Sequence, residues 1–234
     1  MTAPAFTMPH VMRPSTPGTL APDERPPLLL LLHGVGSNEA SMAPFMEAFD
    51  PRLVIVCVRS PLSLGPHSFA WFHVAFTDRG PVIDEPEARA AWTRVPHVID
   101  ESVATFGADP ARVYLAGFSQ GGIVSLATLL TAPERVAGAA VMSGRLLPEV
   151  LPHVVAPERL GAKPLLIVHG TDDRTLPLAH AHHARAKLAG LPIELTYREF
   201  AMGHAVTPES LQVVSAWLTA RLDAPPGLGA PAAR

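Results

Sequence analysis

Ser119 lies in a G-x-S-x-G pattern that spans residues 117–121. An apolar run at residues 113–116 stops at Gly117, and a helix-like stretch follows the pattern. A serine on a sharp strand-to-helix turn presents its hydroxyl above the end of a sheet. Glycines such as Gly117 and Gly121 remove Cβ atoms that would collide in so tight a turn. The pattern therefore predicts a nucleophilic serine; the alternative is a tight turn with an incidental serine.

A nucleophilic serine needs a base, usually histidine, and a carboxylate that orients the base. Two segments downstream carry these groups, and each directly follows a predicted strand. Asp172 and Asp173 follow an apolar strand at residues 164–169, and His204 follows an alternating strand at residues 194–200. In open α/β sheets, sites form at the carboxyl ends of strands. We therefore expect the serine, one aspartate and the histidine to meet at one edge of a sheet.

Strand-like and helix-like segments alternate along the chain, which is typical of an α/β fold with a mostly parallel sheet. The predicted strands cover residues 28–33, 53–58, 112–117, 136–142, 164–169 and 194–200. The predicted helices cover residues 39–48, 87–106, 122–131, 178–189 and 208–222. Pro96 lacks an N–H group and should kink or split the second of these helices.

The chain resembles the phospholipase/carboxylesterase group of α/β-hydrolases, which includes acyl-protein thioesterases and small bacterial carboxylesterases. The resemblance extends from about residue 28 to 220. The matching segments, in chain order, are Leu32-His33-Gly34-Val35-Gly36, Gly117-Phe118-Ser119-Gln120-Gly121-Gly122, His169-Gly170-Thr171-Asp172-Asp173 and Gly203-His204. The resemblance implies an α/β-hydrolase fold with helices on both faces of the sheet and no large lid domain.

The resemblance also implies roles for the acid and the base. The group's His-Gly-x-x-Asp pattern makes Asp173 the acid that orients the base. Asp172 then falls at a variable position, where an aspartate commonly forms turns. His204 matches the group's general base.

The oxyanion hole is implied in the same way. The backbone N–H of Gln120 begins a helix, where a developing oxyanion is favoured. By resemblance, the backbone N–H of Val35 is the second donor, and the imidazole of His33 braces the loop instead of acting in catalysis. Because both donors are backbone groups, we expect the side chains at positions 35 and 120 to be free to vary. The glycines here lack the patterns of a nucleotide site.

Composition and length predict one domain. The chain has 234 residues, 48% of them apolar and 17% charged, which is enough for one large core and short for two. We expect a single α/β-hydrolase domain at residues 28–222. A Pro-rich, partly extended segment precedes it at residues 1–27, with an edge strand around Val11 and Met12. A flexible tail follows at residues 223–234.

Charge and hydropathy narrow the partners and the location. The net charge is −3 and the sequence pI is about 6.4, so we expect no nucleic-acid partner. No apolar run approaches the 18 residues that a membrane span needs, and we expect no stable membrane insertion. The N-terminus does not read as a signal peptide. A single cysteine, Cys57, cannot form an internal disulfide, so a cytoplasmic location is expected, with the thiol a small core hydrophobe.

Residues 59–86 form the longest stretch without clear periodicity. Long structureless loops in compact domains are usually functional or disordered, and the aromatic pair Trp71 and Phe72 argues against disorder. Trp71 and Phe72 line an acyl-binding groove on one interpretation and pack the loop onto the sheet on the other. Leu146 is a further candidate for the apolar wall. Whether residues 59–86 act as a mobile lid stays open.

Three histidines in one predicted helix, at positions 180, 182 and 183, invite a metal interpretation. Zinc sites cluster their ligands at defined spacings with Cys, His or carboxylate partners, and a solvated helix face explains these histidines better. The serine chemistry described above needs neither a metal nor a cofactor, and we expect none.

The predicted function is a serine carboxylic-ester hydrolase that cleaves short- to medium-chain acyl esters through an acyl-enzyme on Ser119. An acyl-protein thioesterase or a lysophospholipase would use the same residues. A ligand receptor without turnover and a peptidase are more distant alternatives. The expected partner is a small acyl ester or thioester, and the sequence is compatible with a homodimer.

Overall fold

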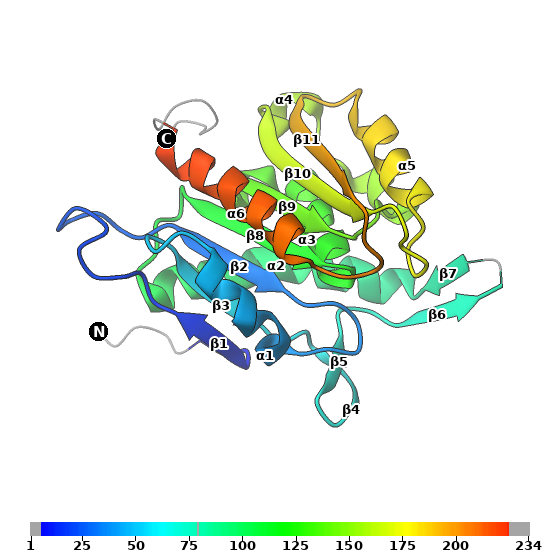
Figure 1. The fold of residues 1–234 in the computed structure, drawn as a ribbon, viewed down its shortest axis with the longest axis horizontal. Helices are drawn as coiled ribbons and strands as arrows, with labels where there is room; N and C mark the ends of the chain where they lie inside the picture. The colour runs from blue at the N-terminus through cyan, green and yellow to red at the C-terminus, as the bar shows by residue number, and fades with distance from the viewer. Residues whose placement is uncertain (1–5, 79, 225–234) are drawn as a thin grey trace.

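A central seven-stranded sheet organises the computed structural model, which describes residues 6–78 and 80–224 (Figure 1). The strands lie in the order β1 (His10–Arg13), β3 (Val54–Val58), β2 (Leu28–Leu32), β8 (Val113–Phe118), β9 (Gly138–Met142), β10 (Lys163–Gly170) and β11 (Ile193–Phe200). Neighbouring strands are parallel except β1, which pairs antiparallel with β3. The mostly parallel sheet is confirmed. Part of the predicted tail, residues 225–234, lies outside the described residues.

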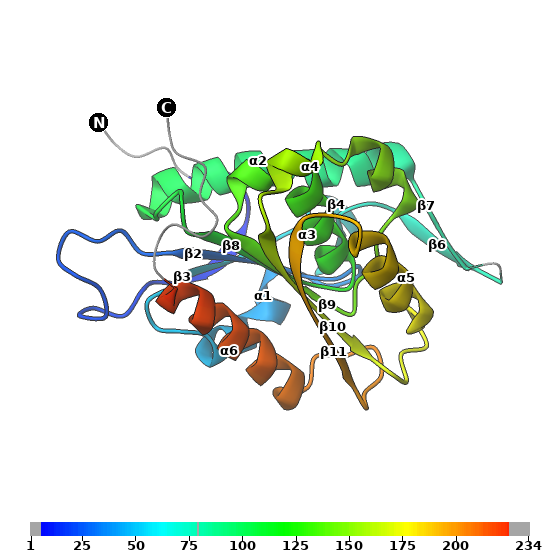
Figure 2. The same ribbon diagram turned by 90° about the horizontal axis from the view of Figure 1, so that it is seen from above.

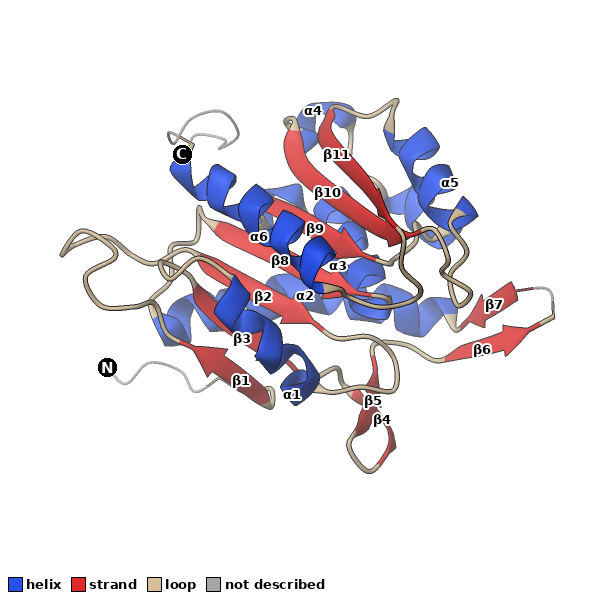
Figure 3. Cartoon of the chain, viewed as in Figure 1, coloured by secondary structure: helices blue, strands red, loops and turns tan. Residues whose placement is uncertain are grey.

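Helices cover both faces of this sheet, as predicted (Figures 2 and 3). One face packs against α2 (Glu85–Phe106), α3 (Gln120–Thr131) and α5 (Ala179–Leu188). The other face packs against α1 (Glu39–Met42), the 3₁₀ helix η1 (Ala43–Ala48) and α6 (Pro208–Asp223). Three short helices, η2 (Pro133–Arg135), η3 (Pro148–His153) and α4 (Pro157–Leu160), complete the set. None of the described helices is both long and apolar enough to cross a bilayer.

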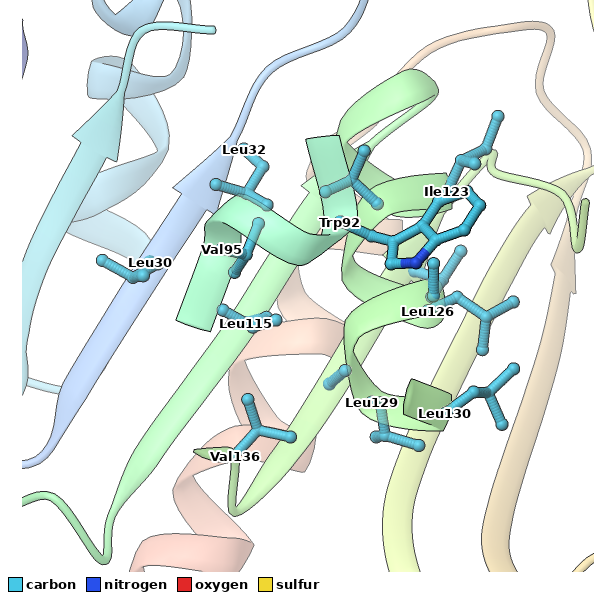
Figure 4. Packing of buried hydrophobic residues seen from close by; sticks show 14 of the residues in the cluster. Leu30, Leu32, Trp92, Val95, Leu115, Ile123, Leu126, Leu129, Leu130 and Val136 are labelled. Carbon is cyan, nitrogen blue, oxygen red and sulfur yellow. The ribbon is translucent and has the colours of Figure 1, made fainter. Parts of the chain in front are cut away.

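The leucine run in β2 shows why a central strand is apolar at every position. Its five side chains are fully buried. Leu28, Leu30 and Leu32 pack into the cluster on the α2 and α3 side, and Leu29 and Leu31 pack into the cluster on the α6 side. Successive side chains of a strand point to opposite faces, so a strand covered on both sides loses the usual apolar–polar alternation. Figure 4 shows part of the first cluster.

Two predicted helices differ from the structure. The helix expected at residues 39–48 is one turn of α-helix followed by 3₁₀ helix, with Pro44 in the first turn of the 3₁₀ segment, where its missing N–H costs little. The helix expected at residues 87–106 begins two residues earlier. It runs unbroken through Pro96, so the expected split is wrong. A buried face that includes Trp92 and Val95 stabilises this helix against the loss of one hydrogen bond.

The stretch at residues 59–86, predicted to lack regular structure, contains two short hairpins. One joins β4 (Leu62–Gly65) to β5 (Ser68–Ala70), and the other joins β6 (Val74–Thr77) to β7 (Gly80–Ile83). Figure 1 shows both at the arrowhead end of the parallel strands. Strands of three or four residues are too short for a period-2 pattern to stand out in a sequence.

Arg13, at the end of the predicted edge strand, ties the N-terminal segment to the domain. Its guanidinium donates to the backbone carbonyls of Met46 at 2.8 Å, Phe49 at 3.1 Å and Asp50 at 2.7 Å. Because hydrogen bonds to a charged group are the stronger kind, we expect Arg13→Ala to lower the free energy of unfolding by about 2–4 kcal/mol. Urea unfolding measures this value. As a control, Arg25→Ala removes one exposed hydrogen bond to Gly107 and should cost less than about 1 kcal/mol. Equal costs for the two variants would contradict the role of Arg13 in holding the N-terminal segment.

Cys57 is fully buried in β3, as expected of a small core hydrophobe. Burial raises the pKa of its thiol to about 12. The thiolate, the nucleophilic form of cysteine, is therefore scarce at neutral pH. Cys57 does not compete with Ser119 as a nucleophile.

Candidate active site

Ser119 sits on the turn between β8 and α3 with φ 53° and ψ −116°. A side chain at either flanking glycine has no room in this turn. An added Cβ at Gly121 would lie 2.0 Å from the carbonyl oxygen of Leu32, and one at Gly117 would lie 2.2 Å from the backbone of Gly121. The helix begins at Gln120, two residues earlier than predicted. The sequence thus forces a strained turn that holds the Ser119 hydroxyl at the end of the sheet.

The structure brings Ser119, His204 and Asp173 together in one hydrogen-bonded chain. His204 Nε2 lies 2.9 Å from Ser119 Oγ, and His204 Nδ1 lies 2.7 Å from Asp173 Oδ2. A carboxylate only accepts, so Nδ1 carries the proton in the neutral ring and Nε2 is left to accept the serine proton. This arrangement lets the histidine act as a general base toward the serine hydroxyl.

Asp173, rather than the neighbouring Asp172, is the aspartate that binds His204. Its side chain is buried, and its second oxygen accepts from the backbone N–H groups of Thr175 at 2.9 Å and Leu176 at 2.8 Å. Asp172 is exposed, and its carboxylate accepts only from the hydroxyl of Thr171, at 3.3 Å, among the described residues. The buried hydrogen bonds fix the carboxylate of Asp173 in the orientation that His204 needs.

Strand pairing positions the acid and the base. β10 and β11 run parallel with Gly170 opposite Phe200, so their following loops leave the sheet side by side. The backbone N–H of Thr171 donates to Phe200 at 2.8 Å, and that of Asp172 donates to Met202 at 3.1 Å. These bonds set the loop with Asp173 against the loop with His204.

The loop after β2, residues 33–38, supplies the predicted second oxyanion donor and will be called the oxyanion loop. An added Cβ at Gly34 would lie 3.2 Å from the Cβ of Ser119, so the loop approaches the serine closely. Among the described residues, the backbone N–H groups of Val35 and Gln120 donate to no other group. Both donors are thus available to a substrate oxygen.

The oxyanion loop is fastened to the β4–β5 hairpin. The backbone N–H of Gly36 donates to Phe69 at 2.9 Å, and the N–H of Phe69 donates back to Ser37 at 2.9 Å. The Asn38 side chain donates to the backbone carbonyl of His67 at 2.8 Å. Part of the stretch at residues 59–86 therefore supports the site by backbone pairing.

His33 lies inside the oxyanion loop as a fully buried side chain. Its Nε2 accepts from the backbone N–H of Ser60 at 3.0 Å, and its Nδ1 donates to the carbonyl of Gly34 at 2.8 Å. Burial lowers the pKa of this imidazole, which keeps the ring neutral at neutral pH. Both ring nitrogens are occupied by backbone groups, which agrees with a bracing role.

A cavity of about 420 Å³ opens beside Ser119 and His204. Its other lining residues are mostly apolar and comprise Gly34, Val35, Met42, Phe45, Phe118, Ala205 and Val206, with the polar Ser37, Ser41 and Thr175. Sequence reasoning missed Met42, Phe45 and Val206 as candidates. Two weak signals were available. Val206 closely follows the Gly203-His204 motif, and Met42 and Phe45 lie in the helical segment after the oxyanion loop.

The three predicted substrate-binding residues do not line this cavity. Trp71 and Phe72 are each 1% exposed and belong to the core on the α2 and α3 side. Leu146 is 5% exposed in the same core. These side chains pack within the core, and a direct contact with substrate stays a prediction for all three.

The three histidines at positions 180, 182 and 183, predicted to lie on a solvated helix face, belong to α5; His182 and His183 are exposed and His180 is half-buried. His182 pairs with Glu199, Nε2 to Oε1 at 2.7 Å, and both side chains are partly exposed. Within the described part of the chain, no group of three or more His, Cys, Asp or Glu side chains is arranged to hold a metal ion.

In a comparison with known proteins, residues 20–222 of this chain match the model of the phospholipase/carboxylesterase family. Carboxylesterase SOBER1 of Arabidopsis thaliana is 28% identical over 213 residues, covering 83% of this chain and 90% of that protein. Acyl-protein thioesterase 1 of Eremothecium gossypii is 28% identical over 209 residues, covering 83% of this chain and 88% of that protein. A Bacillus cereus carboxylesterase structure superposes with a TM-score of 0.75 at 22% identity, covering 92% and 94%, which shows the shared fold.

Proposed function

The chain belongs to the phospholipase/carboxylesterase family of α/β-hydrolases, and from that premise we propose that it hydrolyses carboxylic esters through an acyl-enzyme on Ser119. The observation that carries the proposal is the hydrogen-bonded chain from Ser119 through His204 to the buried Asp173. The backbone N–H groups of Val35 and Gln120, which have no partner within the described part of the chain, support it. Relatives named carboxylesterase and acyl-protein thioesterase support the same chemistry.

In the acylation step, Ser119 Oγ attacks the acyl carbonyl carbon while its proton moves to His204 Nε2. The carbonyl oxygen becomes an oxyanion that accepts from the N–H groups of Val35 and Gln120. Asp173 stabilises the imidazolium that forms. The tetrahedral intermediate collapses, the bond to the alcohol or thiol breaks, and the leaving group takes the proton from His204.

In the deacylation step, a water molecule takes the place of the leaving group. His204 Nε2 accepts a proton from this water as its oxygen attacks the acyl carbonyl. The second tetrahedral intermediate uses the same two oxyanion donors. Its collapse breaks the bond to Ser119 Oγ, returns the proton from His204 to the serine, and releases the carboxylic acid.

We assign the cavity beside Ser119 to the acyl chain. Its volume of about 420 Å³ lies in the lower part of the range of small-molecule pockets, about 300–1,000 Å³. Apolar side chains such as Met42, Phe45 and Val206 dominate its wall, which suits a hydrocarbon chain. These features favour short- to medium-chain acyl groups over long ones.

Steady-state hydrolysis of p-nitrophenyl esters from acetyl to palmitoyl tests this function. We expect many turnovers per protein chain, a maximum of kcat/KM between butanoyl and decanoyl, and a decline toward palmitoyl. Less than one turnover at every chain length would reject the enzyme in favour of a ligand receptor. A maximum at palmitoyl would keep the enzyme and reject the assigned acyl cavity.

Narrowing the cavity should shift the acyl preference toward shorter chains. We expect Val206→Phe to lower kcat/KM for the octanoyl ester by about 10-fold or more and to leave the acetyl ester within about 3-fold, because the added ring fills space that only the longer chain uses. Leu211→Phe, which faces a separate hollow between η1 and α6, is the matched control. An equal loss for both esters would contradict the acyl assignment.

Thioester hydrolysis is the second candidate because a relative is an acyl-protein thioesterase. Two substrates with the same acyl chain, ethyl hexanoate and S-ethyl hexanethioate, compare the leaving groups directly. A kcat/KM ratio above about 10 in favour of the thioester, beyond the difference in their uncatalysed hydrolysis rates, would make the thioesterase the better description.

A further inference from the structure

The side chain of Gln120 is clamped between two backbone groups and is only 3% exposed. Its Oε1 accepts from the backbone N–H of Trp71 at 2.7 Å, and its Nε2 donates to the backbone carbonyl of Phe72 at 2.7 Å. A buried amide that meets one donor and one acceptor has a single satisfied orientation. The expectation that the side chain at position 120 is free to vary is therefore wrong. The side chain is buried, and both of its hydrogen bonds need the amide group.

Trp71 connects this clamp to the oxyanion loop. Its indole Nε1 donates to the carbonyl oxygen of His33 at 3.0 Å. The indole is buried, so loss of this donor would leave the His33 carbonyl without a partner among the described residues. One side chain thus bridges from the nucleophile turn, through Gln120, to the first residue of the oxyanion loop.

His33 then fixes the peptide that carries the second oxyanion donor. Its Nδ1 donates to the carbonyl of Gly34, and that carbonyl shares a planar peptide unit with the N–H of Val35. In a trans peptide the C=O and N–H bonds point in opposite directions. Holding the Gly34 carbonyl therefore aims the Val35 N–H the other way. The bond from the Ser60 N–H to Nε2 keeps the ring in the tautomer that donates from Nδ1.

We propose that the side chains of His33, Trp71 and Gln120 form one oxyanion brace, which sets the positions of the Val35 and Gln120 N–H groups relative to each other. These are positioning residues, because they act through backbone donors and touch no reacting atom. Donor geometry matters most in the tetrahedral intermediates. The brace therefore affects kcat and leaves KM nearly unchanged. This inference rests on the proposed oxyanion role of Val35 and Gln120.

Two variants weaken the brace without adding charge. Trp71→Phe keeps a ring and removes the bond to His33. Gln120→Met keeps the side-chain length and removes both bonds to residues 71 and 72. We expect each to lower kcat about 10- to 100-fold, less than the loss of a whole donor, with KM within about 3-fold and an unchanged pH profile. The double variant should lose less than the product of the single effects, because both act on one chain of contacts.

A control and a conservative pair separate positioning from general damage. Trp92→Phe removes a similar volume from the same core at a residue that does not line the cavity beside Ser119, and it should keep wild-type kcat. The amide nitrogen of asparagine can stand where His33 Nδ1 stands, whereas that of glutamine reaches the place of Nε2. We expect His33→Asn to keep at least about 5-fold more kcat than His33→Gln. This pair also tests the brace if Gln120→Met fails to fold.

The closing experiment measures kcat, KM and the inhibition constant of a trifluoromethyl ketone, which forms a tetrahedral oxyanion adduct on a serine, for all these variants. We expect the inhibition constant of Trp71→Phe to rise by the factor by which its kcat/KM falls. Values of kcat within about 3-fold of Trp92→Phe for both brace variants, or a rise in KM alone, would overturn the brace. Absence of turnover in the wild type would instead reject the proposed function.

Discussion

Replacing Ser119 by alanine is expected to lower kcat for the best p-nitrophenyl ester by about 10⁴- to 10⁶-fold. The substitution removes the oxygen that is hydrogen-bonded to His204 Nε2 at 2.9 Å, and with it the acyl-enzyme route. Alanine also fits the strained turn as well as serine does, because it adds no atom beyond Cβ. The midpoint of thermal unfolding should therefore stay close to that of the wild type, so that the loss is chemical.

Ser143 provides a matched control for this prediction. It also has a positive φ, 49°, directly after β9, and its hydroxyl is buried without a hydrogen-bond partner among the described residues. Ser143→Ala should keep kcat within about 2-fold. Comparable losses in Ser119→Ala and Ser143→Ala would indicate that damage to the sheet edge, rather than loss of the nucleophile, explains the effect.

Replacing Asp173 by asparagine should lower kcat by about 10³- to 10⁴-fold near neutral pH. An asparagine amide can turn its NH₂ group toward His204 Nδ1 and favour the tautomer with the proton on Nε2. That tautomer cannot accept the proton of Ser119. The two backbone N–H groups that now bind the carboxylate of Asp173, at 2.8 and 2.9 Å, can still bind the amide oxygen, so the fold should survive.

The neighbouring Asp172→Asn change is the internal control, because it alters charge equally at an exposed position. We expect its kcat to stay within about 2-fold of the wild type. Initial rates for both variants at several pH values compare them directly. A larger loss in Asp172→Asn than in Asp173→Asn would move the acid to the other aspartate and contradict the assigned chain of hydrogen bonds.

The strands of the central sheet, the nucleophile turn and the candidate acid and base could be predicted because each depends on a short stretch of sequence. A five-residue leucine run is typical of a short strand covered on both faces, and the glycines at 117 and 121 are required by local crowding. Asp173 and His204 each stand a few residues after a strand. Parallel strands bring their carboxyl ends to one edge, so chain order alone predicts that these side chains meet.

Other features depend on contacts between distant segments and left no local signal. The two hairpins within residues 62–83 have strands of three or four residues. The Gln120 amide is fixed by residues 71 and 72, almost fifty positions away in the chain. The cavity wall combines Met42 and Val206, which come from opposite ends of the sequence. Only the folded chain brings such residues together.

Trapping the acyl-enzyme tests the central claim most directly. The wild-type protein is mixed with p-nitrophenyl butanoate, quenched in acid during turnover, digested and analysed by mass spectrometry. We predict a butanoyl group on the peptide that contains Ser119, and none on that peptide in Ser119→Ala. Rapid turnover with the butanoyl group on another residue, or an adduct that persists in Ser119→Ala at the wild-type level, would contradict the account.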